Sequence, residues 1–142
     1  MGENRPLDST GWEMTRTAEE QARLDLVLAM YRDVLIPFDS SQVDRYIAAD
    51  YVQHSSLAPP GRDALKQFLD FIRGQSPDAR TLIKRSFVDG NHVICHTHVI
   101  RHPGDPGLAV VDIFRVDDGL IREHWDVLME VPAKPVNPLP MF

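Results

Sequence analysis

The spacing of apolar residues changes near residue 80, and this change constrains the fold more than any other feature of the sequence. Before it, apolar residues recur every three or four positions, as in helices; after it they alternate, as in strands. Breaks at 89–90, 104–107 and 118–119 separate four predicted strands. Their expected bounds are about 81–88, 91–101, 108–116 and 120–129. Connections this short favour antiparallel neighbours, so we predict a four-stranded meander.

Three helices are expected before the strands. Thr17 and Glu20 have the spacing of a capping box, and an apolar stripe follows as far as Leu35, shortly before Pro37. A short second helix is expected to end near residue 48, and a third to span about 62–73. The segment from Asp50 to His54 is expected to lead into a loop. Helices followed by a meander indicate an α+β fold.

Length and composition limit the classes of protein that fit. The chain of 142 residues is 43% hydrophobic and 25% charged, which predicts one globular domain at 17–131, with a loose arm at 1–16 and a Pro-rich tail at 132–142. Fifteen Lys and Arg against 21 Asp and Glu give a net charge of −6, which argues against nucleic acid. One cysteine excludes an intramolecular disulfide. No apolar run suits a membrane span, so we expect a cytoplasmic protein.

Asp112 is the most informative polar residue, because it lies inside an otherwise apolar strand. If the next hairpin has a three-residue loop, Val116 pairs with Leu120 and Asp112 lies opposite His124. Asp112, His124 and Asp126 then share one face of the sheet. If the loop has two residues, Asp112 faces Trp125 instead and the cluster dissolves. A structural alternative is an aspartate satisfied at a strand edge or bulge.

Several histidines could join this cluster. A loop centred on 103–107 would bring His96 and His98 alongside Asp112 and Val110, and a chain crossing the mouth of a curved sheet could point His54 inward. Each could equally be a structural or surface histidine. Trp125, Arg115 and Glu123 are expected on the opposite face, where Trp125 packs in the core or an interface and the other two form an ion pair. Cys95 has the parity opposite to that of the histidines, so it is expected on this second face, as inert packing.

The stretch from Gly107 to Val127, together with Tyr51 to His54 and Gly61 to Leu65, resembles the SnoaL-like branch of the nuclear transport factor 2-like superfamily. The resemblance covers about residues 18–131. It implies a cone-shaped fold in which three helices pack on a strongly curved, mostly antiparallel sheet and enclose an apolar cavity. It also implies a homodimer through the outer sheet face, for which Trp125, Ile113, Val111 and Val127 are candidates.

Polyketide cyclases that look like this chain use an acidic cavity residue as a general base and need neither metal nor organic cofactor. By this resemblance the catalytic candidates are Asp112, His124, Asp126, His54 and His98. We expect Asp112 to be the base, because Val110 and Phe114 make its surroundings the drier ones. The residues expected to bind substrate are Tyr51, His96, Val110, Phe114 and Phe68.

Two functions fit these features. One is a cofactor-independent enzyme that cyclises, by an aldol reaction, or isomerises a small apolar carbonyl compound. The other is a non-catalytic protein that binds a small molecule in the same cavity. A metal site built from the histidines and carboxylates is a third possibility, which the family pattern argues against. Our first hypothesis is a lyase- or isomerase-like activity on a polyketide-like compound with no metal, and the non-catalytic binding protein is its alternative.

Overall fold

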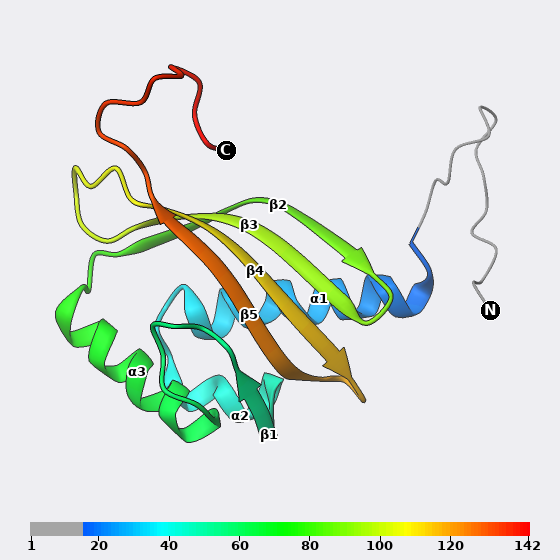
Figure 1. Ribbon diagram of the computed structural model, residues 1–142. Coiled ribbons are helices and arrows are strands. Elements are labelled where there is room, and N and C mark those ends of the chain that lie inside the picture. The colour runs from blue at the N-terminus through cyan, green and yellow to red at the C-terminus, as the bar shows by residue number, and fades with distance from the viewer. Residues whose placement is uncertain (1–15) are drawn as a thin grey trace, which may run out of the picture.

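The computed structural model describes residues 16–142, so nearly all of the arm predicted at 1–16 lies outside the described residues. Three α-helices pack on a five-stranded mixed sheet that curls without closing (Figure 1). The helices are α1 (Ala18–Met30), α2 (Val43–Tyr46) and α3 (Arg62–Gln75), and the strands are β1 (Ile47–Gln53), β2 (Arg80–Asp89), β3 (His92–Ile100), β4 (Leu108–Asp117) and β5 (Leu120–Glu130). The predicted α+β class is confirmed.

The sheet has the strand order β1-β5-β4-β3-β2, in which β2 to β5 form the predicted antiparallel meander. The fifth strand, β1, runs parallel to β5 at the edge of the sheet. We had expected its residues to end a helix and enter a loop, and this was wrong. A parallel pair joins segments far apart in the chain, so its formation depends on β5 and not on the local pattern.

The first helix begins at the predicted capping box. The Thr17 side chain accepts a hydrogen bond from the Glu20 backbone at 3.1 Å, and the Glu20 side chain accepts one from the Thr17 backbone at 3.0 Å. After α1 the chain makes a π-helical turn (Tyr31–Leu35), in which the backbone N–H of Ile36 donates to the Tyr31 carbonyl at 2.8 Å. Such turns insert one residue into a helix and are frequent at functional sites.

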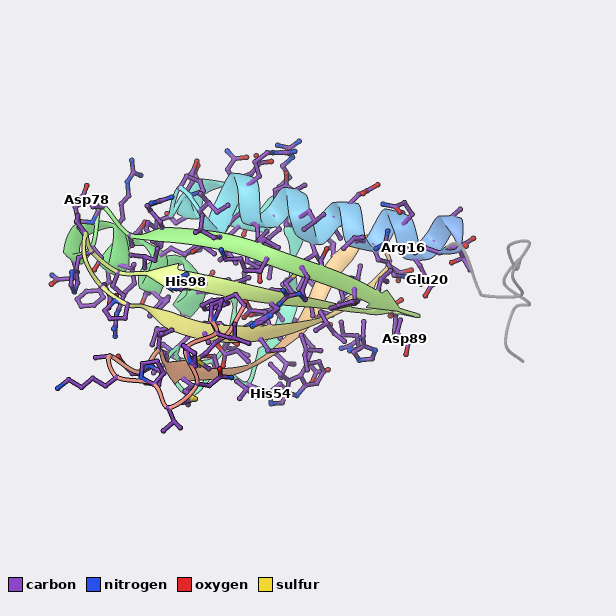
Figure 2. The ribbon with its side chains drawn as sticks, turned by 90° about the horizontal axis from the view of Figure 1, so that it is seen from above. Arg16, Glu20, His54, Asp78, Asp89 and His98 are labelled. Carbon is purple, nitrogen blue, oxygen red and sulfur yellow. The ribbon has the colours of Figure 1, made fainter. Side chains whose placement is uncertain are left out.

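The sheet has an inner face, which packs on α1, and an outer face. Val93, Cys95, Phe114, Val116 and Ile121 lie on the inner face and are at most 3% exposed. The outer face carries large exposed apolar side chains, namely Phe87, Val111 and Val127. The C-terminal segment after β5 lies on the side of the sheet away from α1 (Figure 2). No helix within residues 16–142 combines the length and apolar character that crossing a bilayer requires.

The hairpin between β4 and β5 differs from the prediction and still places the expected residues on one face. Asp117 pairs with Leu120 around a two-residue turn, in which Asp118 and Gly119 have φ of 50° and 71°. Positive φ at both turn residues is typical of a type I′ hairpin. A register shift between Arg115 and Val116 then adds one residue on β5.

The bulge restores the side-chain parity that the short loop would have reversed. Asp112 therefore lies opposite Asp126, and His124 lies opposite Phe114. The predicted pairing of Asp112 with His124 was wrong, whereas the shared face of Asp112, His124 and Asp126 is observed.

The observed register between β3 and β4 differs from the predicted register by one residue. Cys95 lies opposite Asp112, and Thr97 lies opposite Val110. Because a shift of one residue moves every side chain to the other face, His96 and His98 lie on the outer face. Cys95, which we had placed away from the acidic cluster, faces it.

Thr97 is a buried hydroxyl residue at 1% exposure, and within residues 16–142 its Oγ1 has no hydrogen-bond partner. Replacing Thr97 with Val removes this unsatisfied group while keeping the shape of the side chain. We expect Thr97→Val to raise the free energy of unfolding by about 1 kcal/mol, measured by urea denaturation. Thr97→Ser, which keeps the hydroxyl and loses a methyl group, should lower it. A less stable Thr97→Val protein would show that an ordered water satisfies the hydroxyl.

Candidate active site

Asp112 on β4 is the centre of a buried polar cluster. Its Oδ2 accepts a hydrogen bond from the Tyr31 hydroxyl at 2.5 Å, and its Oδ1 lies 2.8 Å from Nε2 of His124. Asp112 is 9% exposed, Tyr31 1% and His124 8%. The π-helical turn, β4 and β5 thus supply one polar group each, and each of these buried groups has a hydrogen-bond partner.

The edge strand β1 completes the cluster. Gln53 at its end is the register partner of His124, and Oε1 of Gln53 lies 2.6 Å from Nδ1 of His124. Two residues later the Ser55 hydroxyl donates to Oδ2 of Asp126 at 2.8 Å. The parallel pairing of β1 with β5 is therefore what brings Gln53 and Ser55 to the cluster.

Two carboxylates and one imidazole lie close together. One oxygen of Asp112, one of Asp126 and one ring nitrogen of His124 all lie within 4.8 Å of one another. Like charges opposite each other in a sheet are destabilising, and the hydroxyl groups of Tyr31 and Ser55, each of which donates to one of the two carboxylates, offset this repulsion. These atom types could also bind zinc or iron. Both His124 nitrogens already face protein oxygens, however, so a metal would have to displace one of these contacts.

Aromatic side chains surround the polar groups. The ring of Phe114 stacks on His124 with 4.8 Å between centroids, and Tyr31 meets Phe114 edge-on. Burial, followed by the charge of Asp112, raises the pKa of Tyr31 well above its ordinary value. The pKa of Tyr51 is raised by burial and by the charges of Asp112 and Asp126. Both tyrosines therefore stay protonated near neutral pH and can act as hydrogen-bond donors.

Cys95 on β3 lies opposite Asp112 on the inner face of the sheet and is 0% exposed. Burial, with a further contribution from the charge of Asp112, raises the pKa of its thiol to about 12. Since the thiolate is the reactive form, we expect the folded protein to react with Ellman's reagent at pH 8 at least about 10³-fold more slowly than the urea-unfolded chain. Reaction of the folded protein at the rate of the unfolded chain would contradict this burial.

Three of the predicted site histidines lie elsewhere. His54 donates from Nε2 to Glu123 at 2.7 Å and stacks on Trp125 with centroids 5.0 Å apart, so it lies on the side of the sheet away from α1 (Figure 2). His98 donates from Nε2 to the Pro106 carbonyl at 2.7 Å, and His96 is bonded to Arg85. The positions predicted for His96 and His98 beside Asp112 were therefore wrong, because they depended on a register that a single residue reverses. His54, which was expected to point inward, points outward, since its neighbour Gln53 on β1 takes the inner face.

The predicted substrate-binding residues are also divided. Tyr51, Val110 and Phe114 are buried on the cluster side, Phe68 on α3 is half-buried, and His96 lies on the outer face. The binding role of each stays a prediction. On the outer face Arg115 donates to Glu123 at 3.0 Å, which confirms the predicted cross-strand ion pair.

Sequence reasoning missed Tyr31, Gln53 and Ser55. Tyr31 belongs to the apolar stripe of the first helix, and its hydroxyl is the only signal that it does more than pack. Gln53 lies in the motif from Tyr51 to His54, from which we predicted site roles for Tyr51 and His54 but none for Gln53. Because β1 was not predicted, no sequence argument could place Gln53 beside His124.

Comparison with known proteins supports the fold. Residues 27–124 match the family model described as SnoaL-like domain. A solved structure from Kribbella flavida DSM 17836, provisionally described as a ketosteroid isomerase, has 20% identity and a TM-score of 0.69, covering 88% of this chain and 95% of that one. A Bacillus cereus ATCC 10987 structure, provisionally described as a polyketide cyclase, has 18% identity and a TM-score of 0.64, covering 87% and 83%.

A third similar structure, from Mesorhizobium loti, is described as a nuclear transport factor 2-like protein of unknown function. It has 19% identity and a TM-score of 0.67, and the match covers 81% of this chain and 97% of that one. No curated protein matches the chain. The predicted nuclear transport factor 2-like fold is confirmed, whereas the enclosed cavity stays a prediction.

Proposed function

Because the chain belongs to the SnoaL-like domain family, we propose that it is a cofactor-independent enzyme that performs general acid/base chemistry on a small apolar carbonyl compound. The observation that carries the proposal is the cluster of Asp112, His124 and Asp126, whose polar atoms lie within 4.8 Å of one another beside Phe114. The names of two similar structures, polyketide cyclase and ketosteroid isomerase, also point to carbonyl substrates.

The contacts favour Asp126 over Asp112 as the base. Both oxygens of Asp112 are engaged, one by Tyr31 and one by His124. Asp126 accepts a hydrogen bond from Ser55 on Oδ2, and within residues 16–142 its Oδ1 accepts none. A general base needs a lone pair within reach of the proton that it removes. We therefore propose Asp126 as the base, in place of Asp112, the drier carboxylate that we had expected.

In the proposed step, Asp126 takes a proton from the carbon next to the carbonyl group. The electron pair of that C–H bond moves to the carbonyl oxygen and forms an enolate, which an O–H or N–H donor of the cluster stabilises. In an aldol closure the enolate carbon attacks a second carbonyl carbon, and the resulting alkoxide takes up a proton. In an isomerisation, a proton returns to a different carbon. The acid is the Asp112–His124 pair, which donates the proton held between Oδ1 and Nε2 and recovers a proton when Asp126 gives up the one that it took from the substrate.

The test is hydrogen–deuterium exchange next to the carbonyl group, followed by NMR in D₂O. The probes are small apolar ketones such as 2-tetralone and a 3-ketosteroid. We expect the protein to accelerate exchange, and Asp126→Asn to lower the rate by about 10² or more. Asp117→Asn, an exposed aspartate at the end of β4, is the matched control and should leave the rate unchanged.

The other outcomes are equally informative. Loss of exchange in Asp112→Asn with retention in Asp126→Asn would make Asp112 the base. No acceleration with any probe would overturn the enzymatic proposal in favour of a protein that only binds its small molecule.

We further propose that the outer sheet face pairs with a second copy of the chain. Val127 is 72% exposed there, beside Val111 at 36%, and an apolar surface of this kind favours association. Light scattering should then give a particle of twice the chain mass of 16.1 kDa. Val127→Asp should yield a folded monomer, and a wild-type monomer at micromolar concentration would refute the pairing.

A further inference from the structure

Both ring nitrogens of His124 face oxygen atoms. Nε2 lies 2.8 Å from Oδ1 of Asp112, and Nδ1 lies 2.6 Å from Oε1 of Gln53. A neutral imidazole carries one proton, so one nitrogen donates and the other accepts. What His124 can do for the reaction therefore depends on which nitrogen keeps the proton.

The contacts of Gln53 decide this point. The oxygen and nitrogen of a glutamine side chain are assigned from the groups that they meet. The backbone N–H of Ser55 donates to the same Gln53 atom at 3.1 Å, and a backbone N–H can only donate, so that atom must be the oxygen. The remaining lone pair of this oxygen faces Nδ1 of His124, which must therefore carry a hydrogen.

Tyr51 is the neighbour of Gln53 on the same face of β1, and the Gln53 side chain acts to lower the pKa of the Tyr51 phenol, against the larger effect of burial. The position of the Gln53 oxygen is set by the Ser55 backbone N–H.

Asp112 is held just as firmly on its far side. The buried Tyr31 hydroxyl donates to Oδ2, and Tyr31 keeps its own proton because burial raises its pKa. Only Oδ1 is left to face His124. With Nδ1 already protonated, Nε2 and Oδ1 hold one proton between them, either on the imidazole or on the carboxyl group.

We propose that Gln53 is a positioning residue that keeps a proton on Nδ1 of His124, so that Nε2 and Asp112 share the proton that the reaction transfers. The assignment of the ring proton stands on the contacts alone, whereas the role of the shared proton rests on the proposed function. Gln53 itself takes no part in bond making. An imidazole held in the wrong tautomer costs an enzyme orders of magnitude in rate.

The test is ¹⁵N NMR of the histidine rings in the full-length protein, recorded up to a pH at which the ring of His124 is neutral. The His124 signals are assigned by their loss in His124→Gln. In the wild type we expect Nδ1 to show the shift of a protonated nitrogen. In Gln53→Leu, which has no acceptor, the proton should move to Nε2 and Nδ1 should show the shift of an unprotonated nitrogen.

Two further variants separate positioning from simple structural damage. Gln53→Glu keeps an acceptor and should restore the protonated Nδ1. Val52→Ala alters a 44% exposed neighbour on β1 and should leave the His124 signals unchanged. If Gln53→Leu does not fold, the wild-type spectrum and Gln53→Glu still test the assignment. The proposal fails if wild-type Nδ1 is unprotonated, if Gln53→Glu loses the Nδ1 proton, or if a folded Gln53→Leu keeps it.

The experiment distinguishes this inference from the proposed function, because the ring spectrum needs no substrate. If the wild type exchanges no carbonyl probe but shows the expected tautomers, the enzymatic proposal fails and the role of Gln53 in fixing His124 stands. If exchange is present and Gln53→Leu lowers it at least tenfold in step with the tautomer change, both are supported. Exchange that is unchanged in a folded Gln53→Leu would refute the role of the tautomer in the reaction.

Discussion

Gly107→Ala is expected to lower the free energy of unfolding by about 4 kcal/mol, because two effects add at this position. Gly107 has φ of 91°, a backbone conformation that residues with a Cβ atom rarely adopt. A Cβ there would overlap the backbone carbonyl oxygen of Val99 and lie 2.7 Å from Nε2 of His98. The first of these neighbours is backbone, so relief would require movement of β3 or β4. Urea denaturation monitored by circular dichroism measures the loss.

Gly104→Ala in the same loop is the matched control. Gly104 has φ of 81°, but nothing lies within 4 Å of its added Cβ. Its substitution should therefore cost only the backbone strain, about 1 kcal/mol. If the two variants lose equal stability, the close approach of Gly107 to Val99 contributes nothing.

Asp112→Ala is the second substitution with a large expected effect, a loss of about 3 kcal/mol in the free energy of unfolding. It removes the acceptor of both the Tyr31 hydroxyl and Nε2 of His124, and both of these side chains are buried. Each unpaired buried group carries a desolvation cost of about 1–3 kcal/mol. Relief of the repulsion between Asp112 and Asp126 offsets only part of this cost.

Asp112→Asn separates the hydrogen bonds from the charge. Asparagine has the same shape, accepts from Tyr31 through its oxygen and presents an N–H₂ group to Nε2 of His124. We expect it to lose about 1 kcal/mol, and urea midpoints for both variants measured side by side decide the matter. Asp112→Ala as stable as the wild type would show that the cluster contributes nothing to the fold.

Local patterns in the sequence were enough to predict the bounds of four of the five strands. The expected bounds of β2 to β5 agree with the structure to within about one residue, because alternation and Gly-containing turns are local features. The capping box at Thr17 likewise predicted the start of α1. The second helix was predicted too long, since Ile47 already begins β1.

Local patterns were not enough to predict which side chains meet at the candidate site. Asp112, His124 and Asp126 do share a face, although the hairpin has the two-residue loop that was expected to separate them. A bulge restored the side-chain parity, and the alternation of apolar and polar residues along β5 does not predict this bulge. For β3 no bulge intervened, and a register one residue from the expected one placed His96 and His98 on the outer face.

The sequence by itself determined the class of fold, the bounds of most helices and strands, and the side-chain alternation that makes an aspartate in an apolar strand noticeable. Only the tertiary structure decided which groups meet that aspartate. Tyr31 donates to it from the π-helical turn, and the pairing of β1 with β5 places Gln53 against His124, which contacts the same aspartate. The physical reason is that periodicity is set by neighbours in the chain, whereas turn type, bulges and parallel pairing are set by the free energy of the whole packed sheet.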